Sequence, residues 1–215
     1  MARSPDVRAS WLALPPEPWK NGGGVTRTLA ADPAGHWRVS IADIDRDGPY
    51  SCFPGQDRVS VVLSGAGVAL RGDGVAVALR PREPALFAGD VALQSRLEDG
   101  PVRVLNLFVQ RGRARARVAC LGAQGGACDA GSLTDAPGQY LAARLIVAVE
   151  AGVYAGPEPG MQLTLAAGEF VLLQADAAAP EDSTRGASSP GAFVPAPANG
   201  FAVSLDISVQ APGLR

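Results

Sequence analysis

Two arginines on separate predicted strands are the first candidates for chemistry in this sequence. Arg38 lies in the alternating segment 37–44, where Arg38 and Ser40 share one face of an extended chain. Arg58 opens the segment 58–64 and would lie at the mouth of that strand. Alternation alone leaves open which face of each strand lines the interior.

A buried arginine requires a partner. If the face of Arg38 points inward, its guanidinium sits where an unpaired charge is costly, so it needs an acidic side chain or an anionic ligand. Asp43 or Asp90 could supply a structural ion pair. A carboxylate ligand is the alternative, because arginine binds that group through two parallel hydrogen bonds.

The only lysine, Lys20, precedes a run of glycines. All other basic side chains are arginine, and a site that needs a compact ammonium cannot use arginine instead. An ordinary exposed lysine is the alternative. The glycines at 22–24 let backbone N–H groups approach a ligand, but the glycine patterns of phosphate loops are absent and no helix pattern follows. The simpler interpretation is a tight turn entering a strand, with Lys20 and Asn21 at its rim.

Histidine and cysteine are too sparse for the common metal and nucleophile sites. His36 is the only histidine, and no cluster of metal-ligand types occurs at short spacing. The three cysteines, Cys52, Cys120 and Cys128, do not suggest a disulfide framework and fit a reducing cytoplasm. Cys52 has no histidine nearby in sequence, so we expect a small buried cysteine rather than a nucleophile. We therefore expect no metal ion, no cofactor and no catalytic residue of these types.

Two further residues could contact a ligand. Asn106 shares a strand face with Val104 and Phe108, and a lone amide among apolar neighbours must be satisfied by backbone, water or ligand. Phe53 lies between two turns just before Arg58, where its ring could contact the apolar part of a small molecule.

The composition excludes several classes of protein. The chain has 215 residues, 47% hydrophobic and 19% charged, which is enough to bury a core. Its net charge of −2 argues against a general nucleic-acid binder. The longest charge-free run, Gly186 to Leu205, contains prolines that disfavour a membrane-spanning helix. The N-terminus lacks the apolar run of a secretion signal, so we expect a cytoplasmic protein.

The periodicity is almost entirely that of strands. Short segments rich in Val, Leu and Ile are bounded by Gly, Pro or Asp, and no long amphipathic helix pattern occurs. These segments are 37–44, 58–64, 75–80, 102–109, 144–150, 161–166, 169–174 and 201–209. Their spacing and turn residues predict a closed all-β architecture.

A weak internal repeat divides the chain into two similar halves. Apolar strands and glycine turns follow in the same order in each half, and the closing strands match with Leu105 over Leu205. We therefore predict two β-barrel domains, 1–112 and 113–215. The arginine-rich stretch 111–117 at the junction is predicted to be a solvated connecting strand.

Four motifs in the first half resemble those of the HutD/Ves family. The resemblance covers residues 11–112 well and the second half poorly. The motifs are WKNGGGxTR at 19–27, WRVSIA at 37–42, DGPYSxFPGxDR at 47–58 and FAGD at 87–90. In the family, an Asp-Phe pair is expected before an Asn-hydrophobic-Met segment, whereas residues 103–108 here read RVLNLF. This departure implies that an arginine of the first half lacks a family ion-pair partner.

The resemblance implies a cupin-type fold with two barrels in one chain, a bicupin, in agreement with the repeat. It also implies an association with bacterial histidine utilisation, where such proteins look like metal-free binders or regulators. Candidate ligands from that pathway are urocanate and formylated glutamate.

The leading hypothesis is a metal-free protein that binds a small anionic carboxylate metabolite in its first barrel, in a regulatory or accessory role. The carboxylate would meet Arg38 or Arg58, and Trp37 or Phe53 would contact the apolar part of the ligand. The candidate ligand-binding residues are Lys20, Asn21, Arg38, Ser40, Phe53, Arg58 and Asn106.

Two other hypotheses stay open. A metal-independent cupin-like isomerase or hydrolase could act on a related acid, with a buried Lys20 as base and Asp43 or Asp90 as acid. A scaffold protein would instead show an apolar surface patch and no polar pocket. We expect no nucleic-acid or membrane partner, and open sheet edges make a homodimer plausible.

Overall fold

The computed structural model describes residues 7–122, 126–131, 139–156, 161–174 and 200–210, and all regular elements there except one 3-10 turn are strands. They are β1 (Val7–Ser10), β2 (Glu17–Pro18), β3 (Gly24–Ala31), β4 (Trp37–Ile44), β5 (Gly48–Tyr50), β6 (Gln56–Ser64), β7 (Val68–Gly72), β8 (Val75–Leu79), β9 (Pro84–Ala88), β10 (Leu93–Leu97), β11 (Val102–Gln110), β12 (Ala114–Leu121), β13 (Ala127–Gly131), β14 (Gln139–Ala148), β15 (Gly152–Ala155), β16 (Gln162–Leu165), β17 (Glu169–Gln174) and β18 (Ala202–Gln210). The predicted all-β class is confirmed. The predicted loop at 175–200 lies almost wholly outside the described residues.

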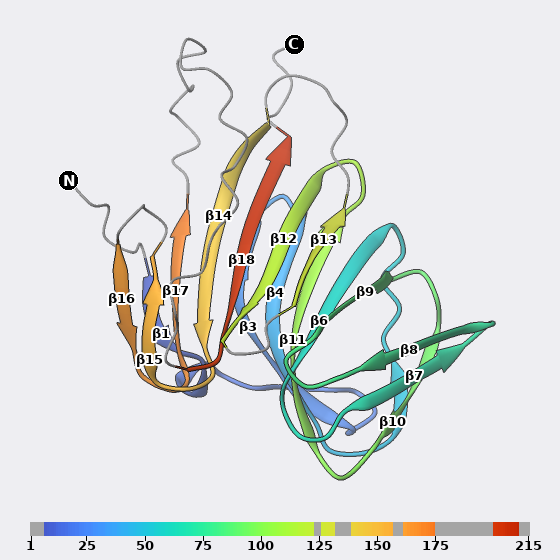
Figure 1. Cartoon of the computed structure of the whole chain (residues 1–215). Helices are drawn as coiled ribbons and strands as arrows, with labels where there is room; N and C mark the ends of the chain where they lie inside the picture. The colour runs from blue at the N-terminus through green and yellow to red at the C-terminus, as the bar shows by residue number, and fades with distance from the viewer. Residues whose placement is uncertain (1–6, 123–125, 132–138, 157–160, 175–199, 211–215) are drawn as a thin grey trace.

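The strands form two large sheets and two small ones (Figure 1). The first half supplies a six-stranded sheet, β2-β3-β4-β11-β6-β9, and a four-stranded sheet, β5-β10-β7-β8. The second half supplies a six-stranded sheet, β1-β17-β14-β18-β12-β13, and the pair β15-β16. β1 comes from the start of the chain and pairs with β17, so the first strand belongs to the sheet of the second half.

The described strands form open sheets, and no closed barrel is found among them. The chain leaves the four-stranded sheet after β8 and enters the six-stranded sheet at β9 through Pro81 and Arg82. Proline cannot donate to a sheet ladder, and Arg82 has a left-handed φ of 65°. This corner separates β8 from β9, which are not hydrogen-bonded neighbours.

The largest core lies between the two six-stranded sheets. Alternation along β4 directs Trp37, Val39 and Ile41 into this core, where they pack with Val118 and Leu205 of the second half. A second core, which includes Ile44 and Val104, fills the space between the first six-stranded sheet and the four-stranded sheet. The first large sheet is therefore buried on both faces, which is why its strands are almost continuously apolar.

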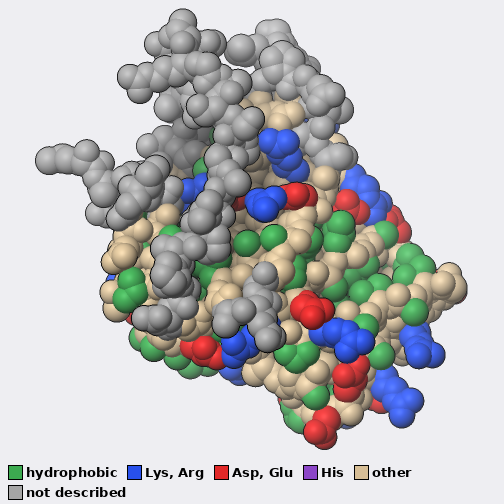
Figure 2. Space-filling model, viewed as in Figure 1, with side chains coloured by type: hydrophobic (Ala, Val, Ile, Leu, Met, Phe, Trp, Pro, Cys, Tyr) green, Lys and Arg blue, Asp and Glu red, His purple; other side chains and the backbone are tan. Residues whose placement is uncertain are grey.

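Within the described residues, no helix is long and apolar enough to cross a bilayer. On the face shown in Figure 2, acidic and basic side chains lie next to one another. β12 explains part of this pattern, because Arg115 and Arg117 are exposed and alternate with buried Ala114 and Ala116. The predicted connecting strand at 111–117 therefore corresponds largely to the start of β12.

Candidate functional site

Cross-strand pairing brings the predicted arginines together. β11 lies between β4 and β6, and its Phe108 is directly opposite both Arg38 and Arg58. Two residues along, Asn106 is directly opposite both Ser40 and Ser60. Side chains two residues apart on a strand share a face, so these two rows lie side by side on the sheet face that looks away from the second half.

These rows form the floor of a cavity in the first half. The cavity holds about 360 Å³ of empty space, counting the part open to solvent. Its lining residues are Trp19, Thr26, Arg38, Ser40, Ala42, Tyr50, Ser51, Phe53, Arg58, Asn106 and Phe108. Among the predicted ligand-binding residues, Arg38, Ser40, Phe53, Arg58 and Asn106 therefore line one space.

Arg58 is the most unusual of them, because it is charged and only 4% exposed. Its Nη1 donates to the carbonyl of Ser51 at 2.9 Å and its Nη2 to Oδ1 of Asn106 at 3.3 Å, while its buried Nε has no partner among the described residues. Four rings surround the guanidinium carbon, with centroids at 4.3 Å (Tyr50), 4.7 Å (Phe108), 5.2 Å (Phe87) and 5.3 Å (Phe53).

Among the described residues, no acidic side chain neutralises Arg58. None of the ion pairs between described residues involves it. Burial lowers the pKa of Arg58, and the neighbouring charge of Arg38 acts in the same direction, against an opposing effect of Tyr50. The ring faces supply partial compensation through cation–π contacts.

Arg38 places a second cation beside the first. Its guanidinium carbon lies 4.7 Å from the centroid of Phe108 and 5.6 Å from that of Phe53, so both arginines contact the same two rings. Arg38 is half-buried and has no hydrogen bond or ion pair with another described residue. Its N–H groups are therefore free to bind a ligand.

Asn106 joins the polar residues on the cavity floor. Its Oδ1 accepts from Ser60 Oγ at 2.7 Å, from the Tyr50 hydroxyl at 3.1 Å and from Arg58. Its Nδ2 makes only a long 3.5 Å contact with the carbonyl of Val104. The acceptor end of the amide is saturated, whereas its donor end has capacity left for a ligand.

The acids expected to neutralise the arginines lie elsewhere. Asp43 is on the opposite face of β4 because it is an odd number of residues from Arg38, and it binds Arg27 and Arg103, each at 2.6 Å. Burial raises the pKa of Asp43, but the hydrogen bonds from these two arginines outweigh it and the net shift is downward.

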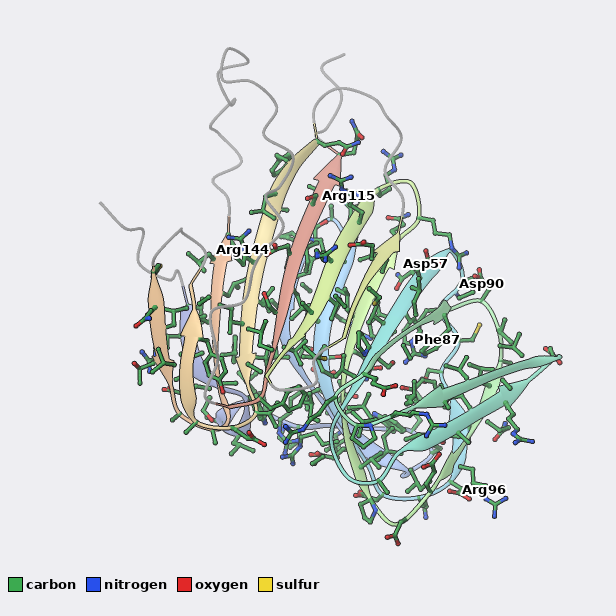
Figure 3. All side chains as sticks on the ribbon, viewed as in Figure 1. Asp57, Phe87, Asp90, Arg96, Arg115 and Arg144 are labelled. Atoms are coloured by element: carbon green, nitrogen blue, oxygen red, sulfur yellow. The ribbon has the colours of Figure 1, made fainter. Side chains whose placement is uncertain are left out.

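Asp90 pairs with Arg111 at 2.6 Å rather than with an arginine of the cavity. Arg111 also binds Asp57 at 2.6 Å, at the start of β6. Asp57 and Asp90 are labelled in Figure 3. Val104 precedes Asn106 on its strand face and is fully buried and apolar, so the inner face of β11 supplies no acid there either.

The residues predicted to close the mouth do not line the cavity. Asn21 accepts a hydrogen bond from the N–H of Gly23 at 2.9 Å and stabilises the turn, as the simpler interpretation predicted. Lys20 is exposed in the same turn, so the burial required for a lysine base is absent. Arg46 ties this turn to the next loop through a 2.8 Å hydrogen bond to the carbonyl of Asn21.

Two expectations about individual side chains are corrected, and the only histidine is placed. Trp37 cannot contact a ligand in the cavity, because alternation sends it to the core between the large sheets. Cys52 is exposed rather than buried, and its Sγ donates to the carbonyl of Asp90 at 3.0 Å. His36 lies outside the cavity and is 3.0 Å from Asp32.

The cavity lining also includes residues that were not among the predicted ligand-binding residues. Trp19 donates from Nε1 to Thr26 Oγ1 at 2.7 Å and contributes one wall. Tyr50 and Ser51 come from the motif that supplied Phe53, and Phe108 from the strand face of Asn106. A signal existed for Tyr50 and Phe108, because aromatic rings near a buried guanidinium are its usual compensation.

The fold and this site define an all-β protein whose first half holds a cation-rich cavity on a sheet buried on both faces. A sequence model of the HutD family matches residues 13–189, and the chain belongs to this family. The family name links it to the histidine-utilisation locus.

Relatives and solved structures agree with this assignment. The chain is 37% identical over 111 residues to protein Ves of Citrobacter koseri, and 38% identical over 110 residues to an uncharacterized protein encoded in the hutC 3′ region of Pseudomonas putida. These alignments cover 49% and 48% of this chain, and each covers 58% of the relative, so the chain spans little more than half the length of the curated relatives it matches.

Two solved structures are similar over nearly their whole length. A conserved protein of unknown function from Pseudomonas aeruginosa PAO1 is 26% identical, with a TM-score of 0.66 and coverage of 96% of this chain and 99% of that one. HutD from Pseudomonas fluorescens SBW25, solved in a formate condition, is 25% identical, with a TM-score of 0.64 and coverage of 96% and 100%.

Proposed function

We propose that the cavity of the first half binds a small carboxylate anion without the help of a metal ion. The observation that carries this proposal is Arg58, a guanidinium that is 4% exposed with no carboxylate partner among the described residues. A buried, uncompensated charge is costly, and an anionic ligand removes that cost on binding.

The chemistry of the lining favours a carboxylate in particular. Arg38 and the unpartnered Nε of Arg58 are charged donors, and the amide of Asn106 and the hydroxyl of Ser40 add neutral ones. Planar guanidinium groups bind carboxylates through paired hydrogen bonds. The ring of Phe53 gives the apolar part of a ligand a surface to contact.

The family assignment narrows the candidate ligands. A family named for histidine utilisation points to carboxylic acids of that pathway, of which urocanate and formylated glutamate are the candidates. Binding of such an intermediate would serve a regulatory or accessory role in the cytoplasm. The acid and base considered for an isomerase or hydrolase are outside the cavity lining, which favours binding over turnover.

We also infer that the two halves are related units of a bicupin. Four strands of each large sheet occur in the same order, β4-β11-β6-β9 and β12-β18-β14-β17. Leu105 is paired with Ile41 and Val61, and Leu205 occupies the same place between Val118 and Leu145.

Isothermal titration calorimetry with urocanate and with N-formylglutamate tests the binding function. One charge-assisted hydrogen bond contributes roughly 1.5–3 kcal/mol, so Arg58→Ala and Arg38→Ala should each weaken binding about tenfold to a hundredfold. Arg115→Ala is the matched control, since Arg115 is exposed on β12 in the other half (Figure 3).

Unchanged affinity in both cavity variants, with thermal melts that show them folded, would exclude these arginines as anchors. Catalytic consumption of either acid, followed by NMR, would replace the binding function with an enzymatic one.

A further inference from the structure

The β7–β8 hairpin ends the four-stranded sheet on an open edge. Its loop has two residues, Asp73 and Gly74, with φ of 42° and 76°. Two positive φ values in a two-residue loop are those of a type I′ turn, which closes on a pair that exchanges both of its backbone hydrogen bonds. That pair is Gly72 and Val75.

The hairpin register determines which backbone groups face outward. Antiparallel strands alternate hydrogen-bonded and non-hydrogen-bonded pairs, so Val75 and Val77 bond to β7 and the residues between do not. The N–H and C=O groups of Ala76 and Ala78 therefore point away from β7, toward the free side of the sheet. No described backbone group outside the strand ladder bonds to them.

β8 also lacks the residues that normally protect a sheet edge. Charged side chains and proline discourage pairing with another chain. In the two six-stranded sheets and the four-stranded sheet, every other edge strand carries a charged residue or a proline. These residues are Arg8 in β1, Glu17 and Pro18 in β2, Pro49 in β5, Pro84 in β9 and Asp129 in β13. β8 contains only valine, alanine and leucine.

Both faces of the edge are suited to a second strand. On the face toward the second core, Val75 is 36% exposed and Val77 is half-buried. On the outer face, Ala76 and Ala78 are small and exposed. The hairpin is the element that extends to the right in Figure 1, and apolar side chains are visible there in Figure 2.

We propose that β8 pairs antiparallel with β8 of a second copy of this chain, with Ala76 of each copy opposite Ala78 of the other. In this register, the outward N–H and C=O groups of Ala76 and Ala78 in one copy form backbone hydrogen bonds with those of Ala78 and Ala76 in the other. Val77 of one copy lies opposite Val77 of the other, at the two-fold axis. The register also brings Arg80 of one copy beside Asp73–Gly74 of the other, so the ends of the interface are charge-complementary. No like charges face one another between 75 and 79.

Analytical ultracentrifugation of the full chain tests the pairing. A single short strand gives a small interface, so wild type should be mainly monomeric near 1 µM and mainly dimeric near 200 µM, on the order of a weak complex. Because Ala76 faces Ala78, Ala76→Glu with Ala78→Glu places like charges opposite each other in both pairs. Ala76→Glu with Ala78→Lys places opposite charges there and is the matched control.

The Glu/Glu variant should dissociate at least about tenfold more readily than the Glu/Lys variant, since two cross-strand pairs change sign. Wild type that stays monomeric throughout would overturn the proposal. The proposal would also be overturned if both variants dimerised as wild type does. A Glu/Lys variant whose dimer is as weak as that of the Glu/Glu variant would exclude this register.

Hydrogen exchange of the wild-type chain gives a test without substitutions. The amides of Ala76 and Ala78 should exchange at least about tenfold more slowly at the high concentration than at the low one, whereas that of Val77 should not change. Equal exchange of Ala76 and Ala78 at both concentrations would contradict the pairing.

Discussion

Asn106 sets the charge of the cavity floor. In the second half the aligned position is Asp206, whose carboxylate binds Arg144 at 2.5 Å. The first half has an amide at this place, with Oδ1 accepting from three donors and no negative charge to neutralise Arg58. Arg144 is directly opposite Asp206, whereas Asn106 is opposite Ser60 and reaches Arg58 from the next pair along the strand. The second half therefore has an ion pair on this part of the strand, and the first half has an arginine next to a neutral amide.

Asn106→Asp should weaken anion binding and leave the fold intact. The new carboxylate would pair with Arg58 and occupy the role of the ligand, so we expect affinity for a carboxylate at least about tenfold weaker, with an equal or higher free energy of unfolding. Calorimetry and urea unfolding measure the two quantities. Asn21→Asp makes the same change outside the cavity, and similar losses in both variants would contradict this role of Asn106.

The three cysteines should differ sharply in reactivity. Cys52 is exposed, whereas burial raises the pKa of Cys120 to about 12 and that of Cys128 to about 11. The thiolate is the reactive form of a cysteine. At pH 8, one thiol per chain should therefore react rapidly with a disulfide reagent, and the other two should react slowly. Cys52→Ser should remove the rapid phase, and a rapid phase of two equivalents would disprove the assignment.

At the scale of elements, Asp90 connects the β5–β6 loop to the end of β11. Hydrogen bonds from Arg111 and from the N–H of Gly55 lower the pKa of Asp90 from 3.8 to about 2. A lowered carboxyl pKa stabilises the fold fully above the unfolded value and less as pH falls toward the folded one.

Asp90→Asn should therefore lower the free energy of unfolding at pH 6. The difference in free energy of unfolding between the variant and wild type should shrink as pH falls from 3.8 to about 2. Urea unfolding at several pH values checks this. A difference that stays constant or grows toward acid pH would show that Asp90 acts through something other than its charge.

Strand periodicity predicted the strands that are longest and richest in Val, Leu and Ile, but it missed shorter strands both inside the sheets and at their edges. The segments 37–44 and 169–174 coincide with β4 and β17, because apolar residues on both faces give a strong signal. β5 and β10 were missed because each is short and carries polar residues, proline or glycine.

For the site, the alternation of side chains along a strand predicted which residues share a strand face. Alternation put Arg38 and Ser40 on a shared face, but which face is interior depends on the second half covering Trp37. The wall from Trp19 and the pairing of Asp90 with Arg111 are long-range contacts that no local pattern contains.

At the scale of the whole molecule, the core between the large sheets should make the halves unfold together. Leu205→Ala in the second half removes contacts with residues of both halves and should cost about 2–5 kcal/mol, or roughly 5–20 °C in melting temperature. Calorimetry should show one endotherm before and after the change. Leu12→Ala, at a side chain 59% exposed, is the control, and a second endotherm would mean that the halves unfold separately.

The positions of the three tryptophans have a practical consequence. Trp11 and Trp37 are sealed in the core between the large sheets, whereas Trp19 forms a wall of the cavity with its indole nitrogen bonded to Thr26. Occupation of the cavity changes the surroundings of one indole out of three. The unlabelled protein thus carries its own optical reporter, whose emission can be titrated against a constant internal background.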